Sequence, residues 1–274
     1  MQLSEARLKE LQQVELDIFK SFVSVCETLG IRYYLIAGTL LGAVRHKGFI
    51  PWDDDIDVGI PREDYELFIS KAQDLLPSHL FLQTYKTDRG YCQAFAKIRN
   101  TNTAFIEESV QNTPINHGIY IDIFPLDKCS VNVRYTLPFR LKERVYRLRG
   151  SCMAKGSKPP LMFRLIRLAC APLSLNPYKS MEKLDKHYQT MPSGDMLINF
   201  GGIYGKREIM PAEWYGDGAL IEFEGMLVSV PCEYDKVLTS LYGDYMTPPP
   251  VEKRVTHHHT TVIDTKHSYK QYIK

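Results

Sequence analysis

Hydrophobic residues recur at three- and four-residue steps in the first thirty positions of the chain. Between residues 3 and 29 the repeating positions are Leu11, Val14, Ile18, Phe22, Val25 and Leu29. This spacing predicts one amphipathic helix. Gly30 follows directly and suits the left-handed position after a helix end. We expect this helix to pack on a sheet that begins at Tyr33.

Further along, helical and strand-like patterns alternate. Helical spacing covers residues 62–76, 181–190 and 234–242, and strand-like runs cover 33–37, 80–85, 92–100, 103–107 and 118–124. A glycine between two apolar runs predicts a β-hairpin over residues 220–231. The alternation predicts an α/β (α+β) fold, with a mixed, strongly twisted sheet and helices on one side.

The acidic stretch within residues 38–59 is the most informative segment. Gly38 and Thr39 follow the 33–37 strand, where a glycine lets backbone N–H groups approach an anion. In an extended chain Asp53, Asp55 and Asp57 share one face, and apolar residues occupy the other. Carboxylates arranged in this way indicate a divalent-metal site, with Mg²⁺ expected and Mn²⁺ as the alternative.

Two other interpretations of this stretch are weaker. A solvated acidic turn would be expected to continue into Ser or Gly, whereas these acids run into Ile56 and Val58. A calcium loop of the EF-hand type would need a glutamate twelve positions after Asp53, and Asp64 stands there.

A further carboxylate lies inside an apolar strand. Asp122 is flanked by Ile121 and Ile123, and burying an acid there is costly unless it is paired or binds a metal. Asp122 is therefore a candidate third carboxylate. Asp127, after Pro125, is expected to be a turn or cap residue.

Two cations in the 92–100 strand share one face. Lys97 and Arg99 fit an exposed edge with solvated side chains and fit equally well a pair of phosphate contacts beside the metal. The residues alone leave both interpretations open.

Composition restricts the class of protein. The chain has 274 residues, 44% hydrophobic and 24% charged, with a formal net charge of +2, so it is not a nucleic-acid-binding polycation. Six scattered cysteines without a Cys-x-x-Cys pair favour a reduced compartment over a disulfide scaffold or zinc ribbon. The polar first ten residues and the lack of a long apolar run predict a cytoplasmic protein without a signal peptide or membrane span.

The basic charge is concentrated between residues 128 and 186. This segment carries fourteen Lys or Arg against three acids, a net charge of +11. Residues 135–149 have helical spacing, and 161–171 are nearly all apolar with two arginines. The segment fits a core helix whose arginines pair elsewhere, and it also fits a surface that touches anionic lipid at the inner face of a membrane.

Several segments of the chain resemble those of a known family. The run 38–46 followed by 51–57 resembles the LicD family of phosphotransferases, which includes bacterial cholinephosphotransferases and fukutin-type proteins. Segments 121–127 and 242–246 extend the resemblance, which covers most of the chain and is weakest over about 128–196.

The resemblance implies a nucleotidyltransferase-like catalytic core over 1–127, a basic helical insertion over 128–190 and a closing region over 191–274. It also implies transfer of a phospho-alcohol from a CDP-activated donor, with CDP-choline favoured, to a sugar of a glycan or its lipid-linked precursor. In nucleotidyltransferase-like proteins a third acid commonly lies beside the Asp-x-Asp pair, which assigns that place to Asp122 and favours phosphate contacts for Lys97 and Arg99.

The site expected on these grounds has catalytic and metal-holding acids and a set of substrate contacts. Asp55 and Asp57 hold the metal, and Asp122 is either a third ligand or the base on the acceptor hydroxyl. The expected substrate contacts are Gly38, Thr39, Arg45, His46, Trp52, Lys97 and Arg99. Trp52 fits stacking on a base or a choline-like cation, and also fits plain packing.

Several alternatives stay open from the sequence alone. The chain could be a nucleotidyltransferase that acts on a small molecule or sugar, or an inactive glycan- or lipid-binding module. Asp53 and Asp54 could hold metal or only support it. One of the histidines at 257–259 could contact substrate phosphate, and the glycine-rich stretch 199–207 could close over substrate.

Overall fold

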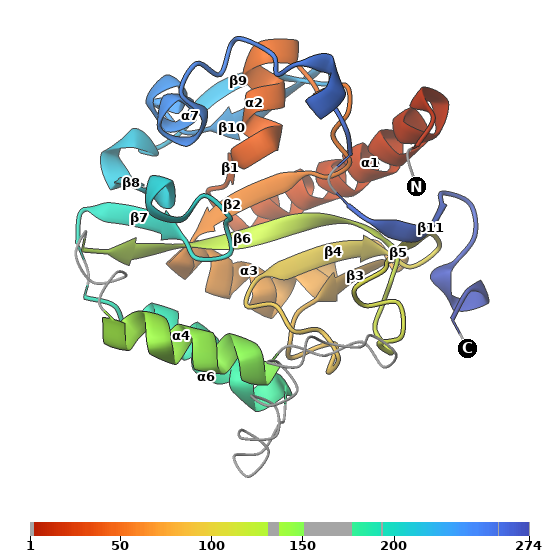
Figure 1. The fold of residues 1–274 in the computed structure, drawn as a ribbon, viewed down its shortest axis with the longest axis horizontal. Coiled ribbons are helices and arrows are strands. Elements are labelled where there is room, and N and C mark those ends of the chain that lie inside the picture. The colour runs from red at the N-terminus through yellow and green to blue at the C-terminus, as the bar shows by residue number, and fades with distance from the viewer. Residues whose placement is uncertain (1–2, 131–136, 151–176, 193, 257, 274) are drawn as a thin grey trace.

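One twisted, mixed sheet organises the computed structural model (Figure 1). The structure describes residues 3–130, 137–150, 177–192, 194–256 and 258–273. Strands β1, β2, β6, β4 and β3 are neighbours in that order, and β7 and β8 extend the sheet from β6. Only β2 and β6 run parallel among the described pairs of this sheet. The strands of the sheet are β1 (Tyr34–Leu35), β2 (Asp57–Pro61), β3 (Leu80–Gln83), β4 (Ala96–Asn100), β6 (Ile119–Cys129), β7 (Met196–Asn199) and β8 (Ile209–Pro211). The mixed α/β fold expected from the sequence is therefore confirmed.

Two helices cover one face of this sheet. Helix α1 (Glu5–Leu29) and helix α3 (Arg62–Leu75) both pack on β6 and lie behind the sheet in Figure 1. Leu11, Phe19 and Phe22 of α1 are fully buried, and each such side chain contributes about 2–3 kcal/mol by leaving water. Gly30 ends α1 with φ 65°, the left-handed conformation that the sequence predicts there.

The acidic stretch differs from the extended strand expected over 53–57. Strand β2 begins only at Asp57, and residues 53–56 form an irregular loop. The prediction that Asp53, Asp55 and Asp57 share one face of a strand is therefore wrong, because only Asp57 lies in the strand. Helix α2 (Ala37–His46) likewise begins one residue before Gly38, so Gly38 and Thr39 lie in its first turn.

Strand β6 is longer than expected. It continues through Pro125 to Cys129, pairs with β2 on one side, and pairs in turn with β4 and β7 on the other. Asp127 is thus a strand residue, and the turn or cap role expected for it is wrong. Its side chain instead accepts two hydrogen bonds from Arg62, at 2.7 and 2.8 Å.

Arg62 also reaches the helices below the sheet. Its Nη1 donates to Oδ1 of Asp185 at 2.9 Å, and Asp185 belongs to α6 (Pro177–Gln189). Tyr85 donates to the other oxygen of Asp185 at 3.0 Å. We call Arg62, Asp127 and Asp185 the Arg62 clamp. It joins α3, β6 and α6 through buried, paired charges.

The expected basic insertion is helical where the structure describes it. Helices α4 (Leu137–Gly150) and α6 pack together at the lower end of the molecule in Figure 1. A second hydrophobic cluster lies between them and β7, with Phe139, Leu184 and Phe200 among its buried members. The apolar stretch 161–171 lies outside the described residues. Within those residues, no helix has the length and apolar character needed to cross a membrane.

The closing region, residues 191–274, contributes a hairpin, a helix and a strand that pairs with β5 (Ala104–Glu107). The predicted hairpin is confirmed as β9 (Ala219–Phe223) and β10 (Met226–Val230), followed by α7 (Tyr234–Tyr242). Near the C-terminus, β11 (Thr260–Asp264) pairs with β5 in a separate two-stranded sheet. The division at residues 127 and 190 stays a prediction, and β6 and β7 pair across both boundaries.

Candidate active site

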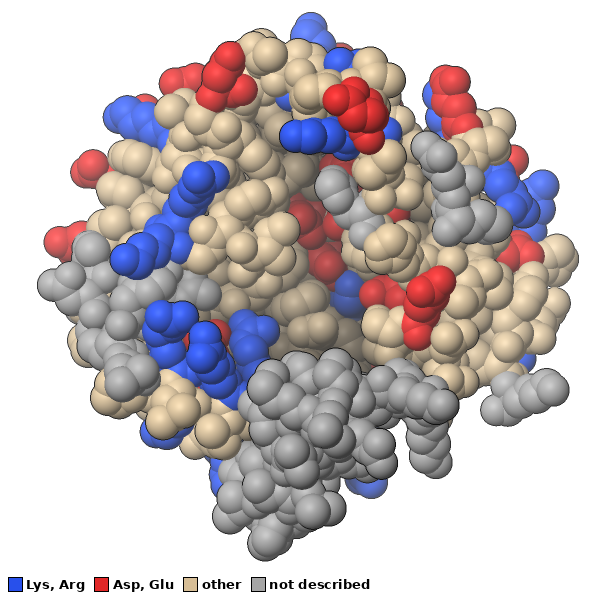
Figure 2. Space-filling view, viewed as in Figure 1, with Lys and Arg blue, Asp and Glu red and all other residues tan. Residues whose placement is uncertain are grey.

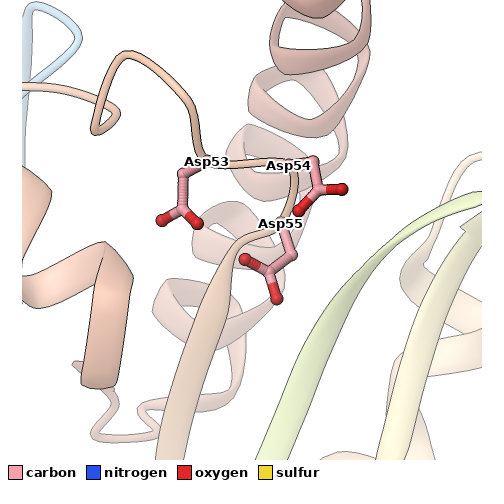
Figure 3. A group of neighbouring side chains, drawn as sticks. All are labelled: Asp53, Asp54 and Asp55. Atoms are coloured by element: carbon pink, nitrogen blue, oxygen red, sulfur yellow. The ribbon is translucent and has the colours of Figure 1, made fainter. Parts of the chain in front are cut away.

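Three consecutive carboxylates gather on the loop that precedes β2. Asp53, Asp54 and Asp55 each offer an oxygen that lies within 4.8 Å of the others, as Figure 3 shows. The backbone holds this arrangement, because Asp53 N–H donates to the Ile50 carbonyl and Gln12 Nε2 donates to the Asp53 carbonyl, both at 2.9 Å. In Figure 2 acidic side chains line the hollow at the centre of the visible face.

Asp57 and Asp122 are neighbours across the two parallel strands. The register pairs Asp57 of β2 with Asp122 of β6, and the Asp122 N–H donates to the Ile56 carbonyl at 2.8 Å. Lys97, opposite Asp122 on β4, places its Nζ 2.6 Å from Asp122 Oδ1. The charges of Asp55 and Asp122 both act on the carboxyl of Asp57, so these three acids lie near one another. Their catalytic and metal-binding roles stay predictions.

We call Asp53, Asp54, Asp55, Asp57 and Asp122 the acidic centre. Burial raises the pKa of Asp53, Asp55 and Asp57, and the charges of neighbouring carboxylates raise these pKa values further. For Asp55 the pKa reaches about 6, although the charge of His258 acts in the opposite direction. Raised values of this kind mean that the carboxylates repel one another and that a cation among them would be stabilised.

His258 is the described histidine of the 257–259 run that reaches the acidic centre. Its backbone N–H donates to Asp54 Oδ2, and its Nδ1 lies 3.2 Å from Asp54 Oδ1. Burial alone would lower the pKa of His258, but the hydrogen bond to Asp54 and the charges of Asp55 and Asp54 raise it to about 9. His258 is therefore a cation at neutral pH. His257 lies outside the described residues.

Glu15 is an acid that the sequence patterns did not single out. It lies in α1, is 1% exposed, and its Oε2 has no hydrogen-bond partner among the described residues. Burial and then the charges of Asp55 and Asp54 raise its pKa. The available signal was its place four residues after Leu11 on the apolar face of the helix, where a charged residue is unusual.

The first turn of α2 adjoins the acidic centre. A Cβ atom at Gly38 would lie 3.0 Å from Asp53 Oδ2, so a glycine permits this close approach. The Thr39 hydroxyl accepts a hydrogen bond from the Asp57 N–H at 2.8 Å. Among the described residues the Thr39 hydroxyl donates no hydrogen bond, so its hydrogen could reach a ligand. A helix N-terminus with such groups can accept a phosphate.

A cationic and aromatic group lies on the α2 side of the acidic centre. Arg45 donates to the Tyr245 carbonyl at 2.9 Å, and its Nε lies 2.9 Å from His46 Nε2. The pKa of His46 is lowered by burial and by the charge of Arg45. The guanidinium of Arg254 lies 5.3 Å from the ring centre of Trp52. Trp52 thus already contacts a cation, and that cation belongs to the protein.

Lys97 and Arg99 are interior residues. They are 6% and 1% exposed, so the exposed-edge interpretation is wrong. Arg99 donates to Gln83 at 2.5 Å and to the Gly118 carbonyl at 2.8 Å, and its guanidinium lies 4.5 Å from the Tyr120 ring centre. A phosphate contact remains a prediction for both residues.

The donor set suits a hard divalent cation. Every ligand atom that the acidic centre offers is a carboxylate oxygen, the type that Mg²⁺ and Mn²⁺ prefer. The buried Glu15 Oε2 without a partner and the raised pKa values both indicate a missing positive charge. The residues present therefore fit such an ion, with Asp53 as an additional candidate ligand beside Asp55 and Asp57.

Acids on two parallel neighbouring strands, beside a helix with Gly38 and Thr39 in its first turn, define the nucleotidyltransferase class of site. Residues 30–142 match the family described as LicD/FKTN/FKRP, nucleotidyltransferase domain. The chain is 31% identical to the lipopolysaccharide cholinephosphotransferase LicD of Haemophilus influenzae over 264 residues, which cover 93% of this chain and 97% of that protein. Human ribitol 5-phosphate transferase FKRP is 57% identical over 42 residues, which cover 15% of this chain and 8% of that protein.

The chain belongs to the LicD family, and it is a phosphotransferase of that family. A protein of Rickettsia prowazekii is 65% identical over 99 residues, which cover 36% of this chain and 33% of that protein.

Proposed function

We propose that this chain transfers a phospho-alcohol from a CDP-activated donor to a sugar of a cell-surface glycan or of its lipid-linked precursor. The favoured donor is CDP-choline. The observation that carries the proposal is the 31% identity to a lipopolysaccharide cholinephosphotransferase over nearly the full length of both chains. The name of the human relative, a ribitol 5-phosphate transferase, supports the phospho-alcohol class and makes CDP-ribitol the second donor to test.

In the proposed reaction the acceptor hydroxyl oxygen attacks the phosphorus that carries the alcohol. The bond from this phosphorus to the bridging oxygen breaks, and CMP leaves with that electron pair. Asp122 takes the proton of the acceptor hydroxyl. Lys97, with its Nζ 2.6 Å from Asp122 Oδ1, orients this carboxyl for that role.

Asp55 and Asp57 would hold Mg²⁺ or Mn²⁺, with Asp53 beside them. When bound, the ion would offset charge on the phosphate oxygens. The N-terminal turn of α2 would bind phosphate through backbone N–H groups and the Thr39 hydroxyl. Thr39 also fixes Asp57 by accepting its backbone N–H, so one residue would position both the phosphate and a metal ligand.

Two arginines and a histidine beside α2 suit the CMP side of the donor. Arg45, His46 and Arg254 lie there next to Trp52. Because the Trp52 ring already contacts Arg254, we assign Trp52 to support of this cation and no longer to a choline-like group. His258 is a further candidate to contact a phosphate oxygen, since it is protonated and adjoins Asp54.

The basic insertion supports peripheral contact with a membrane that carries the acceptor. Arg140, Leu141, Lys142 and Arg144 of α4 are all exposed, Leu141 by 61%. Lys and Arg side chains gather at the lower left of Figure 2, where Figure 1 places α4. We therefore propose a cytoplasmic protein that touches the anionic inner face of the membrane.

The test is product identity. The purified protein is incubated with Mg²⁺ and CDP-choline or CDP-ribitol, with and without a lipid-linked glycan fraction, and CMP is measured. The proposal predicts Mg²⁺-dependent CMP release that the glycan fraction accelerates. Release of pyrophosphate from CTP in the presence of a small acceptor would instead support a nucleotidyltransferase, and no turnover of any donor would support a binding module.

A further inference from the structure

A cavity of about 460 Å³ opens from the acidic centre toward the basic insertion. Asp122 and His258 line one part of it, and Arg147 of α4 and Tyr188 of α6 also line it. It therefore joins the expected base to the lower end of the molecule, where α4 and α6 lie in Figure 1.

The cavity wall combines aromatic faces with hydrogen-bonding groups. Phe95, Tyr120 and Phe200 contribute rings. The Tyr91 hydroxyl is buried and has no hydrogen-bond partner among the described residues. An apolar wall with a few convergent polar groups suits a ligand with an apolar face and several hydroxyls, such as a sugar ring. A ligand hydroxyl would satisfy Tyr91.

The same wall does not suit a quaternary ammonium group. The Nζ of Lys97 already lies 3.4 Å from the ring centre of Tyr120 and 5.6 Å from that of Phe95. Two of the ring faces that could attract an alkylammonium ion therefore contact the protein's own ammonium group. Glu107, which also lines the cavity, lies among cations: burial would raise its pKa, but Lys97, Arg99 and His258 lower it.

The position of the cavity matches the geometry of the reaction. In phosphoryl transfer the attacking and leaving oxygens lie roughly in line with the phosphorus between them. The groups assigned to CMP lie beside α2, which packs on β2, whereas the cavity is lined from β4 and β6. A group that attacks from the opposite side would therefore lie in the cavity and present its hydroxyl to Asp122.

The outer wall lies beyond the part of the chain that matches the nucleotidyltransferase domain. That match ends at residue 142, whereas Arg147, Tyr188 and Phe200 come later. Arg147 donates to the Tyr188 hydroxyl at 3.0 Å and to the Phe200 carbonyl at 2.9 Å, so these three residues form one connected rim.

We propose that this cavity is the acceptor subsite, that it takes one sugar residue of the glycan, and that Tyr91 and the rim at Arg147 bind it. The proposal rests on the proposed transfer to a glycan. It assigns recognition of the acceptor to the basic insertion and leaves the chemistry to the acidic centre.

Two variants with matched controls test the assignment. Tyr91→Phe removes only the unpartnered hydroxyl, and Tyr215→Phe is its control at a buried tyrosine outside the cavity. Arg147→Gln removes the rim cation, and Arg32→Gln is its control at an exposed arginine that pairs with Asp64 and does not line the cavity. CMP release from CDP-choline is measured at fixed donor and varied lipopolysaccharide, at fixed lipopolysaccharide and varied donor, and without acceptor.

We expect Tyr91→Phe to raise the acceptor KM about fivefold and Arg147→Gln to raise it about tenfold, from the loss of one neutral and one charge-assisted hydrogen bond. The donor KM and the acceptor-free release should stay within about twofold of wild type, as should every constant of the two controls. A raised donor KM with an unchanged acceptor KM would place the donor alcohol in the cavity and overturn the proposal. Unchanged constants in both variants would overturn it as well.

A second readout does not depend on turnover. Saturation-transfer NMR uses the oligosaccharide that mild acid releases from lipopolysaccharide, without any donor. Wild type and Arg32→Gln should transfer saturation to the sugar, and Arg147→Gln should transfer much less. No transfer from wild type would contradict the acceptor subsite. Transfer without CMP release from any donor would retain the subsite and contradict only the proposed function.

Discussion

Two groups of buried acids in this protein are treated in opposite ways. In the Arg62 clamp, Asp127 and Asp185 share a guanidinium that donates three hydrogen bonds of 2.7–2.9 Å. In the acidic centre, five carboxylates have Lys97 and His258 as their nearby cations. Both groups are costly to bury, but only in the clamp does one cation donate hydrogen bonds to every carboxylate of the group.

The two groups differ in what shifts the pKa values of their charged side chains. Burial would lower the pKa of Arg62, but its bonds to Asp127 and the charges of Asp127 and Asp185 raise it, as expected for a pair that supports the structure. Burial raises the pKa of Asp127 as well, but the hydrogen bonds and charge of Arg62 oppose that rise. In the acidic centre burial and mutual repulsion both raise the pKa values of Asp53 and Asp57. The paired charges of the clamp join secondary-structure elements. The crowded carboxylates of the acidic centre form a site in which a bound cation would be stabilised.

The largest effect should follow from breaking the clamp. Arg62→Met leaves Asp127 and Asp185 buried without their cation, and we expect the free energy of unfolding to fall by about 3–5 kcal/mol. Urea unfolding measures this. Arg32→Met is the control, since Arg32 is half exposed and lies 3.4 Å from Asp64, and its effect should stay below about 1 kcal/mol. If both variants lowered the free energy of unfolding equally, the clamp would stabilise the fold no more than a surface ion pair does.

The next effect separates activity from stability. Asp57→Asn should reduce CMP release by about 10²–10³, equivalent to about 3–4 kcal/mol of lost transition-state stabilisation. Its free energy of unfolding without metal should stay unchanged or rise, because one member of a repelling group becomes neutral. Asp57→Asn protein with full activity would show that the metal assignment is wrong.

The smallest effect is the pH dependence of the metal-free protein. A folded-state pKa of about 6 for Asp55 lies above its ordinary value, so the folded state binds this proton more tightly than the unfolded state. Stability should therefore fall as the pH rises from 4 toward 6, by about 1–2 kcal/mol. His258, with its pKa raised to about 9, stabilises the fold below its ordinary pKa, and this contribution is lost as the pH rises through 9.

Urea unfolding in EDTA across pH 4–9 checks both signs. Asp55→Asn should remove the acidic part of the decline, and His258→Gln should remove the alkaline part. A metal-free protein that becomes more stable between pH 4 and 6, in both wild type and Asp55→Asn, would contradict the crowding of the acidic centre.

Local patterns predicted much of this fold. Helices α1, α3 and α7 and the β9–β10 hairpin follow from apolar spacing and from Gly and Pro at their ends. The acids of the centre could also be found, because Asp55 and Asp57 lie two residues apart in a distinctive run. The backbone conformation of these acids could not be predicted, because the loop over 53–56 depends on hydrogen bonds to distant residues such as Gln12.

Hydrogen bonds between residues far apart in the sequence could not be predicted from local residue spacing. Arg62 and Asp127 are 65 residues apart, and Asp54 and His258 are 204 apart. Asp127 follows Pro125, which locally suggests a turn, but pairing with β2 and β7 keeps the strand extended there. Tertiary pairing thus overrides the local preference.

The most direct test of the central claim is a calorimetric titration of Mg²⁺ with CMP present. The account predicts that wild type and Asp64→Asn, a variant of an acid far from the centre in the fold, bind the ion with the same affinity, and that Asp55→Asn and Asp57→Asn lose at least about tenfold. Equal Mg²⁺ binding by all four proteins, or none by wild type, would contradict the claim that the acidic centre is built to hold a divalent cation.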